Sequence, residues 1–273
     1  MNPSDTKLSD MTFCALDLET TGTNPALHEI VEVGIIRFSM NGIKDVYDTL
    51  VNPGITIPSE TVGVHGITDE MVQGAPQIED ILFRIDEFIR DSLLVIHCPE
   101  FDLSFLGLAF RKNDMPVPEM TAVDTVRLSR RAYPRLTNCK LETICSHLRL
   151  EIMHHRAYPD ARGCMEIFTD IIRSEDPHGV WTVSHLRNYH GAFVRLSGAK
   201  QVHRINKAGK KLKGIMLGKT VDITYIDQSG NVTKRKIHPR EFITVGGETY
   251  LLAHCHLRGD TRYFKMDRIM EIN

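Results

Sequence analysis

Two acidic side chains stand two positions apart in an otherwise apolar stretch, F-C-A-L-D-L-E-T, from Phe13 to Thr20. The stretch is typical of a buried strand, and in a strand Asp17 and Glu19 leave the same face roughly 7 Å apart. Two carboxylates that point the same way repel each other unless a cation lies between them. Hard oxygen ligands of this kind suit Mg²⁺ or Mn²⁺. A solvated edge strand with two surface acids is the alternative interpretation.

Two further acids occupy predicted starts of helices. Asp102 ends the segment H-C-P-E-F-D, where a short apolar strand passes into a helix, and Asp160 ends the segment H-R-A-Y-P-D. Either acid could simply favour the positive end of its helix, Asp160 as an N-cap. His155 lies five residues before Asp160, and a plain surface histidine would explain it equally well. Taken singly, none of these segments identifies a site.

The elements that must position these acids follow from the apolar patterning. Segments rich in β-branched residues at 30–38 and 46–51, with an Asn-Gly pair between them, predict a hairpin beside the first strand. Apolar residues at helical spacing predict helices, and a short apolar run predicts one more strand. The helices are expected at 76–90, 101–111, 141–148 and 161–173, and the strand at 93–97. This order predicts an α/β domain over residues 11–173, after an N-terminal tail at 1–10.

The pattern changes beyond residue 173. Residues 174–200 contain Pro, Gly and several histidines without clear periodicity, which predicts a linker with a short helix around 181–189. Residues 201–273 hold short β-type segments separated by turn-forming residues, which predicts a small all-β barrel of the SH3/Sm-like kind. Its strands are expected at 221–226, 233–237, 242–245, 250–254 and 262–265.

The bulk composition indicates a soluble globular protein. Hydrophobic residues make up 42% of the chain and charged residues 25%, which are ordinary globular values. No apolar run approaches the roughly 18–20 residues needed to span a bilayer, and the first ten residues lack a signal-peptide core. The six cysteines include no C-x-x-C pair, so they predict neither a disulfide framework nor a zinc site. We therefore expect a cytoplasmic protein with free thiols and no membrane partner.

The charge is divided unevenly along the chain. From Arg195 to the end there are 16 basic and 7 acidic residues, which leaves 17 basic and 28 acidic residues before it. A basic second part suits a polyanionic partner such as nucleic acid. A solvated basic surface is the alternative. The lysines concentrate in a run that comprises Lys207, Lys210, Lys211, Lys213 and Lys219.

Four motifs occur in order over roughly residues 11–173. They read D-L-E-T-T-G from Asp17, V-H-G-I-T from Val64, H-C-P-E-F-D from His97 and H-R-A-Y-P-D-A from His155. In this combination the chain resembles the DEDDh exonucleases, a group that includes polymerase proofreading subunits, RNase T and oligoribonuclease. In that group the third of these motifs usually reads H-N-A-x-F-D, so Cys98 and the proline after it depart from the pattern.

The resemblance implies an RNase H-like fold and metal-dependent 3′→5′ hydrolysis of nucleic acid, with DNA favoured over RNA and single-stranded 3′ ends as substrate. It implies that two divalent cations, Mg²⁺ or Mn²⁺, serve the two ends of an in-line displacement. His155 would then act as general base. The implied metal ligands are Asp17, Glu19, Asp102 and Asp160. His154, next to the implied base, has no assigned role.

The same resemblance implies a substrate site beside the metals. Its residues would be Thr20, Thr21, His65 and Phe101, with Phe101 stacking on or wedging against a base. For the two threonines the alternative is a turn before Gly22, and for Phe101 it is core packing.

The C-terminal segment carries a second resemblance. It reads I-H-P-R at 237–240 and T-Y-L-L-A-H-C-H-L-R-G-D-T-R-Y-F-K-M-D-R-I at 249–269. These segments resemble a WYL domain, with Thr249 in place of the usual tryptophan. The resemblance implies binding of nucleic acid or a nucleotide-like ligand, whereas turn formation and core packing are the alternatives. The implied contacts are Tyr225, Arg240, Tyr250, Arg258 and Arg262.

Three functions fit these observations. The first is an active exonuclease with an accessory nucleic-acid-binding or ligand-binding domain. The second is a regulator whose nuclease domain is inactive, which the retention of all four acids and His155 argues against. The third is a proofreading subunit that acts inside a polymerase or repair complex.

Overall fold

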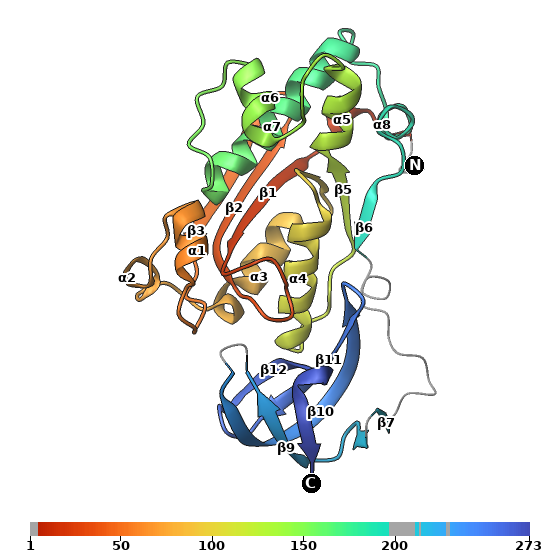
Figure 1. Cartoon of the computed structure of the whole chain (residues 1–273). Coiled ribbons are helices and arrows are strands. Elements are labelled where there is room, and N and C mark those ends of the chain that lie inside the picture. Colours follow the sequence, from red (N-terminus) through yellow and green to blue (C-terminus); the bar gives the residue numbers. More distant parts are fainter. Residues whose placement is uncertain (1–4, 197–210, 213, 228–229) are drawn as a thin grey trace. The chain divides into compact units, whose positions relative to one another are not determined.

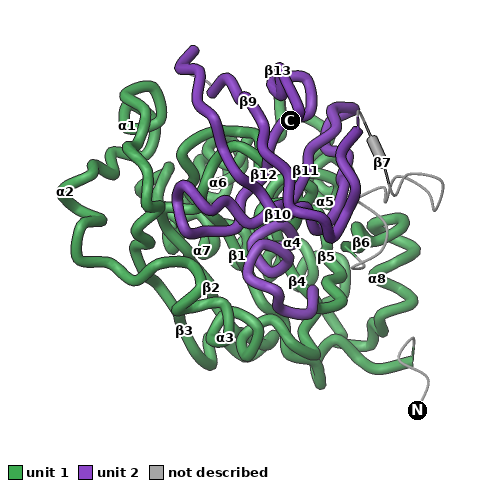
Figure 2. The backbone as a smooth tube through the Cα atoms, turned by 90° about the horizontal axis from the view of Figure 1, so that it is seen from below, with its two compact units in different colours: residues 1–106, 118–196 green, residues 107–117, 197–273 purple. Residues whose placement is uncertain are grey.

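The computed structural model describes residues 5–196, 211–212, 214–227 and 230–273. The chain divides into two compact units, shown in different colours in Figure 2. The first unit comprises residues 1–106 and 118–196, and the second comprises residues 107–117 and 197–273. Each unit has a sheet and a hydrophobic core of its own.

A six-stranded mixed sheet forms the centre of the first unit (Figure 1). Strand β1 lies inside it, antiparallel to β2 and parallel to β4, so the first acidic pair stands in the middle of the sheet and not at an edge. Its order is β3-β2-β1-β4-β5-β6, made of β1 (Phe13–Thr20), β2 (Ile30–Ser39), β3 (Gly42–Leu50), β4 (Leu93–Ile96), β5 (Met120–Asp124) and β6 (Val194–Leu196). The solvated edge strand considered for the acidic pair is therefore not what forms.

Eight helices are described in the chain, and they include all four that the apolar spacing predicts. They are α1 (Ser59–His65), α2 (Asp69–Val72), α3 (Ile78–Ile89), α4 (Glu100–Lys112), α5 (Thr125–Ala132), α6 (Leu141–His147), α7 (Ala157–Glu175) and α8 (Val183–His190). The amphipathic pattern of α3 buries six apolar side chains, and the residue before it supplies a capping box. α7 begins earlier than predicted, so Asp160 lies in its first turn and is not its N-cap.

Aromatic packing fixes α7 against the sheet. The ring of Phe168 on α7 lies 4.8 Å from that of Phe13 on β1 and 6.0 Å from that of Phe38 on β2, measured between ring centroids. All three rings are fully buried. Apolar burial of this kind is the main stabilising contribution to such a core, at about 2 kcal/mol for each large side chain. It anchors the body of α7 on the first half of β1.

Two segments expected to lie outside the α/β domain are part of the first unit. The expected linker at 174–200 contains α8 and the edge strand β6, which pairs antiparallel with β5. The expected tail contributes Leu8, whose side chain is buried and whose N–H donates to the carbonyl of Trp181 at 2.9 Å. Both additions are stabilised by contacts distant in sequence, which local patterning does not reveal.

The second unit contains an antiparallel sheet in the order β12-β11-β10-β9-β13. Its strands are β9 (Val221–Ile226), β10 (Val232–Val245), β11 (Glu248–Cys255), β12 (Asp260–Lys265) and β13 (Ile269–Ile272), and a short pair β7 (Lys211–Leu212) and β8 (Ile215–Met216) precedes them. The described strands form no closed sheet, so the expected barrel is not confirmed. Two predicted strands are one strand, β10, which continues through Pro239 with a register shift against β11. Strand β13 was not predicted.

In the part of the chain that the structure describes, no helix combines the length and the apolar character needed to cross a membrane.

Candidate active site

Carboxylates from β1 and α7 meet at one place in the first unit. Asp17, Glu19 and Asp160 each offer an oxygen, and these oxygens all lie within 4.8 Å of one another. Three of the four predicted metal ligands therefore form one cluster, although 141 residues separate Glu19 from Asp160 in the sequence. The donors are all hard oxygens, which are the ligands that Mg²⁺ and Mn²⁺ prefer.

The fourth carboxylate, Asp102, lies against the same strand. It stands in the first turn of α4 with only 2% of its surface exposed. Its Oδ1 accepts a hydrogen bond from the backbone N–H of Leu18, at 3.1 Å. Leu18 lies between Asp17 and Glu19, so this bond fixes Asp102 beside the pair. The charge of Asp102 is also close enough to raise the pKa of Asp17.

A glycine allows α7 to approach the sheet so closely. Gly34 on β2 is the register partner of Asp17 on β1. A Cβ atom at position 34 would overlap the backbone carbonyl carbon of Ala157 and the backbone nitrogen of Tyr158. Only glycine leaves room for the first residues of α7 here, and Asp160 follows in the same turn. The contact thus explains how Asp160 reaches Asp17.

A buried ion pair holds the start of α7 on β2. The Nε–H of Arg156 donates to both carboxylate oxygens of Glu32, at 2.9 and 3.0 Å, and the N–H of Ala157 donates to Oε2 at 2.8 Å. Glu32 is 1% exposed and is the register partner of Glu19. Neither member of this pair was predicted from the sequence. A lone glutamate in the apolar run I-V-E-V-G was the signal that could have indicated it.

Burial and mutual repulsion make the cluster a poor place for negative charge alone. Burial raises the pKa of Glu19 to about 8, and the charges of Asp160 and Glu32 add to the effect. Burial also raises the pKa of Asp17, with further increases from Asp102 and Asp160. Both shifts mean that the charged forms are disfavoured. A divalent cation between the carboxylates would restore those forms, so the residues present fit such an ion.

Two adjacent histidines contact Asp160 in different ways. The backbone N–H of His155 donates to Asp160 Oδ2, and the Nδ1 of His154 lies 2.9 Å from Asp160 Oδ1. The side chain of His155 is exposed, and its backbone has φ = 63°, in the left-handed region. The structure therefore brings the imidazole of His154 against Asp160, a contact that was not predicted from the sequence. It places the imidazole of His155 at the surface beside it.

The two threonines at the end of β1 make the turn contacts that were the alternative to a substrate role. Thr20 Oγ1 donates to the carbonyl of Gly22 at 2.8 Å. Thr21 Oγ1 accepts from the N–H of Glu29 at 3.0 Å and lies 3.3 Å from Nδ1 of His28. Both threonine side chains are buried. Their hydroxyl groups are thus engaged within the protein in this structure.

The other two predicted substrate residues differ from each other. His65 ends α1 and is buried, and its Nδ1 accepts from the N–H of Ile67 at 3.0 Å, so the proton of the neutral ring resides on Nε2. That Nε2 is sealed from solvent, and no hydrogen-bond partner meets it among the residues that the structure describes. Phe101 is half-buried, with its ring centroid 4.9 Å from that of Phe105, one turn further along α4. Packing explains Phe101 at least in part.

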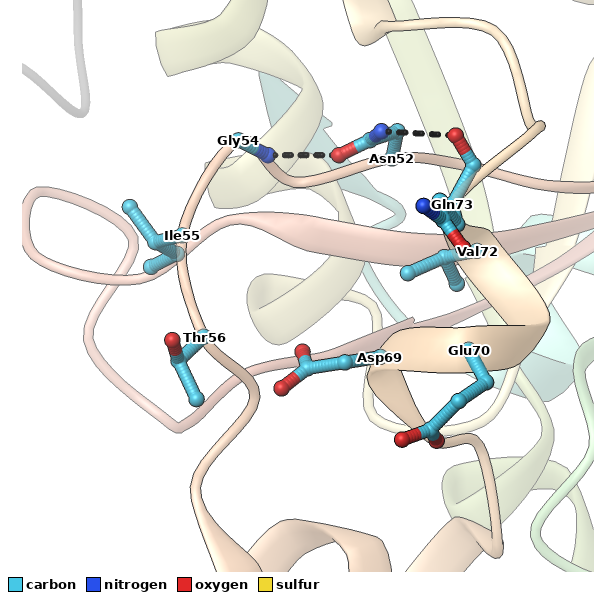
Figure 3. Close-up of a pocket in the computed structure, with 8 residues that line it drawn as sticks. All are labelled: Asn52, Gly54, Ile55, Thr56, Asp69, Glu70, Val72 and Gln73. Carbon is cyan, nitrogen blue, oxygen red and sulfur yellow. Dashed lines mark hydrogen bonds between the residues drawn. The ribbon is translucent and has the colours of Figure 1, made fainter.

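A pocket of about 560 Å³ opens elsewhere in the first unit, at the loop that follows β3 (Figure 3). The carboxylate cluster does not line it. Asn52 organises its wall by accepting from the N–H of Gly54 at 3.0 Å and donating to the carbonyl of Gln73 at 3.4 Å. Asp69 accepts from the N–H of Ile57 at 2.9 Å. The side chains of Asn52 and Asp69 are thus used to shape the loop that lines the pocket.

The five predicted ligand contacts of the second unit are not equally accessible. Tyr225 and Tyr250 are buried, and the hydroxyl of Tyr250 donates to Glu248 at 2.6 Å. Arg262 forms an ion pair with Asp260, Arg240 forms one with Asp114, and Arg258 is exposed. Of the predicted basic run, Lys207, Lys210 and Lys213 and the side chain of Lys211 lie outside the described residues, whereas Lys219 is exposed.

Two family models match the chain. The model described as Exonuclease matches residues 14–168, and the model described as WYL domain matches residues 212–273. The first match contains all four clustered carboxylates, and the second contains the five-stranded sheet.

Curated relatives are PolC-type DNA polymerases III. The protein from Caldanaerobacter subterraneus is 36% identical over 177 residues, which cover 64% of this chain and 13% of the relative. The protein from Listeria monocytogenes is 30% identical over 204 residues, which cover 74% of this chain and 14% of the relative. The chain thus spans only about an eighth of the length of these polymerases.

Solved structures of exonucleases share the fold. Exonuclease I of E. coli in complex with a dT13 oligonucleotide has a TM-score of 0.56 at 16% identity, over 89% of this chain and 55% of that one. The nuclease domain of 3′hExo, a DEDDh family member bound to rAMP, has a TM-score of 0.51 at 17% identity, over 63% of this chain and 95% of that one.

Proposed function

The chain belongs to the exonuclease family and carries a C-terminal WYL domain, and from this premise we propose that it is a metal-dependent 3′→5′ exonuclease acting on DNA. One observation carries the proposal: Asp17, Glu19 and Asp160 offer oxygens within 4.8 Å of one another, with Asp102 fixed beside them. Carboxylates that are gathered and partly or fully buried in this way repel one another, and a bound cation would relieve that repulsion. Cations held by carboxylates are the usual means of hydrolysing a phosphodiester.

Four carboxylates would hold two divalent cations, Mg²⁺ or Mn²⁺. When bound, the cations supply an activated water and stabilise the charge that grows on the leaving oxygen. The chain's own part is to fix the ligands before substrate arrives. β1 aligns Asp17 and Glu19, the Leu18 N–H holds Asp102, and the Gly34 contact brings in Asp160.

His155 would take the proton from the attacking water. Its imidazole is exposed, so it can exchange that proton with solvent. Its backbone N–H bond to Asp160 ties it to the metal ligand. His154 would steady the other oxygen of Asp160. Thr20, Thr21, His65 and Phe101 remain our proposed residues around the terminal nucleotide.

The division of labour follows the charges of the two parts. We assign cutting to residues 11–173, with residues 174–196 as part of the same folded unit, and binding of nucleic acid to residues 201–273. The first part carries an excess of acid that repels phosphates, whereas the C-terminal part carries an excess of base. Lys and Arg that neutralise phosphates add affinity that falls as salt rises. Arg240 and Arg258 are the exposed residues among the proposed contacts, and Arg240 is paired with Asp114. DNA is favoured because the curated relatives are DNA polymerases, and such a substrate is consistent with a cytoplasmic location.

A cleavage assay tests the activity directly. DNA and RNA strands labelled at the 3′ or the 5′ end are incubated with Mg²⁺ or Mn²⁺, with EDTA and the Asp17→Asn variant as controls. The expected result is stepwise shortening from the 3′ end, faster on single-stranded DNA and lost in both controls. Internal cuts, shortening from the 5′ end, or cutting that survives EDTA would reject the proposal. Absence of any cutting would favour the regulator with an inactive nuclease domain.

A polymerase or repair complex is the second candidate setting. The identity to PolC-type polymerases is the observation that favours it. Copurification of a tagged full chain from its own cells would detect a polymerase partner. Recovery of the chain alone, with full activity, would favour an independent enzyme.

A further inference from the structure

One arginine of the second unit is buried in the apolar face of its sheet. Arg235 lies on β10, on the same face as the core residue Ile237, and only 5% of its surface is exposed. Its guanidinium carbon lies 5.2 Å from the ring centroid of Tyr225 and 5.8 Å from that of Phe264. Its Nε–H donates to Thr233 Oγ1 at 2.9 Å. The two rings and one hydroxyl are its partners.

No acid balances this charge among the described residues. The neighbouring arginines of the unit differ, because Arg262 pairs with Asp260 and Arg240 pairs with Asp114. A buried charge without a counter-ion is strongly unfavourable, and contacts with aromatic faces offset only about 1–2 kcal/mol of that penalty. The fold therefore keeps a cation where an apolar residue of similar length would be more stable. Such a residue needs another explanation than stability.

The terminal amino groups of Arg235 remain open at one end. The described side-chain atoms that are sealed from solvent without a partner are His65 Nε2 and Ser129 Oγ, and those of Arg235 are not among them. Nε is engaged with Thr233 and 5% of the residue is exposed, so the two Nη groups are the donors left for a ligand. These two groups form a planar fork that matches two oxygens of a phosphate.

The rings beside Arg235 do not offer a surface for a base. Tyr225 is 6% exposed and Phe264 is fully buried, and their planes meet edge to face with centroids 5.1 Å apart. A base has no room to stack between them. The position can therefore recognise a charged oxyanion that reaches in, but not the identity of a nucleotide.

We propose that Arg235 anchors a site for a terminal phosphate group, a phosphomonoester, in the second unit. A terminal phosphate protrudes and offers three free oxygens to a guanidinium group whose residue is only 5% exposed, whereas an internal phosphodiester offers two and is flanked by a nucleoside on each side. Two sources supply this chemistry: the phosphorylated end of a strand and a free mononucleotide. The proposal rests on the assignment of nucleic-acid binding to this part of the chain and gives it a chemical preference.

Binding is measured on the full chain carrying Asp17→Asn, in EDTA, so that no substrate is consumed. Fluorescence anisotropy compares matched single-stranded oligonucleotides that end in a 5′-phosphate, a 3′-phosphate or hydroxyls only. Calorimetry compares dAMP with deoxyadenosine. A terminal phosphate is expected to tighten binding about tenfold, or about 1.4 kcal/mol. A preference in the oligonucleotide arm identifies a strand end as the source, and one confined to dAMP identifies a mononucleotide.

Variants at position 235 assign the preference to this side chain. Arg235→Met keeps the length and the apolar contacts, and it should abolish the preference for phosphate while its Tm stays level or rises. Arg235→Lys keeps the charge without the fork, so most of the preference should be lost. Lys234→Met is the matched control, because Lys234 is the exposed neighbour on the same strand, and it should keep the full preference.

Equal affinity for phosphorylated and unphosphorylated ligands in both arms would overturn the proposal. So would a phosphate preference that survives in Arg235→Met or, if that variant fails to fold, in Arg235→Lys. Neither result depends on catalysis, because the test protein is inactive by design. Failure of the exonuclease assignment would show instead in the cleavage assay of the unmodified chain.

Discussion

The two units bury charge in opposite ways. In the first, Asp17, Glu19 and Asp160 gather like charges around a point where a bound cation would relieve their repulsion. In the second, Arg235 keeps a single positive charge in an apolar face that has no described acid beside it. Both arrangements lower the stability of the chain by itself. The contrast teaches that an unbalanced buried charge indicates a ligand of the opposite sign.

The sharpest way to break this comparison is to remove one charge from the first cluster. Asp17→Asn should lower the cleavage rate by roughly 10³-fold, because metal-held charge stabilisation is worth several kcal/mol. The same change relieves repulsion, so its Tm without metal should rise. Single-turnover cleavage and thermal melts in EDTA measure the two effects. Asp45→Asn, on exposed β3, is the control and should change neither. A fall in Tm together with the rate would mean that Asp17 is structural.

Breaking the Glu32–Arg156 pair should have the next largest effect, a loss of stability toward unfolding. Arg156→Met leaves the buried Glu32 carboxylate without its partly exposed counter-ion, and a buried polar group that loses its partner destabilises a protein by about 1–3 kcal/mol. The double variant Arg156→Met, Glu32→Gln should recover a large part of that loss. Urea denaturation of both variants measures it. If the double variant is no more stable than the single one, the pair does not act as a unit.

Gly34→Ala tests the close approach of α7 to the sheet. The added methyl group overlaps the backbone at Ala157 and Tyr158, and overpacking of this kind destabilises by about 1–3 kcal/mol. The apparent affinity for Mn²⁺ should weaken as well, because Asp160 is displaced. Gly63→Ala, where the added atom meets nothing within 4 Å, is the matched control. Unchanged metal affinity in Gly34→Ala would separate the packing from the site.

The smallest expected effect is the pH dependence of stability that the partly buried Glu19 carboxyl group causes. Burial raises the pKa of Glu19 from its ordinary value of 4.5 to about 8, so the folded state holds a proton that the unfolded state releases. Without metal, the stability from this group is complete below about pH 4.5 and is lost as pH rises to about 8. Tm in EDTA should therefore fall by a few degrees over that range. Added Mg²⁺ should reverse the fall, and a Tm that rises with pH in EDTA would contradict the assignment.

The sequence predicts elements whose signals are local. The amphipathic spacing of α3 and the Asn-Gly hairpin between β2 and β3 are both confirmed. Strand β5 was missed, because its five residues M-T-A-V-D are too few to show a period. Strand β10 was predicted as two strands, because proline usually interrupts a strand. In the structure, a register shift against β11 accommodates Pro239.

The residues of the candidate site that belong to sequence motifs could be predicted. The four acids were identified from their order in the chain, and the structure brings three of them within 4.8 Å. Features that depend on distant partners were missed. Glu32 and Arg156 lie 124 residues apart, and nothing local marks Arg235 as buried rather than exposed on β10.

The backbone contacts between the N-terminal residues and the segment at the start of α8, called the seam below, set the boundaries of any minimal nuclease fragment. Lys7 bridges to Thr182, and the N–H of Val183 donates to the carbonyl of Thr6 at 3.1 Å. A fragment cut at residues 11 and 173 would discard both sides of this seam and strip β6 from β5. A fragment for expression or crystallisation should therefore start before Thr6 and extend past Leu196.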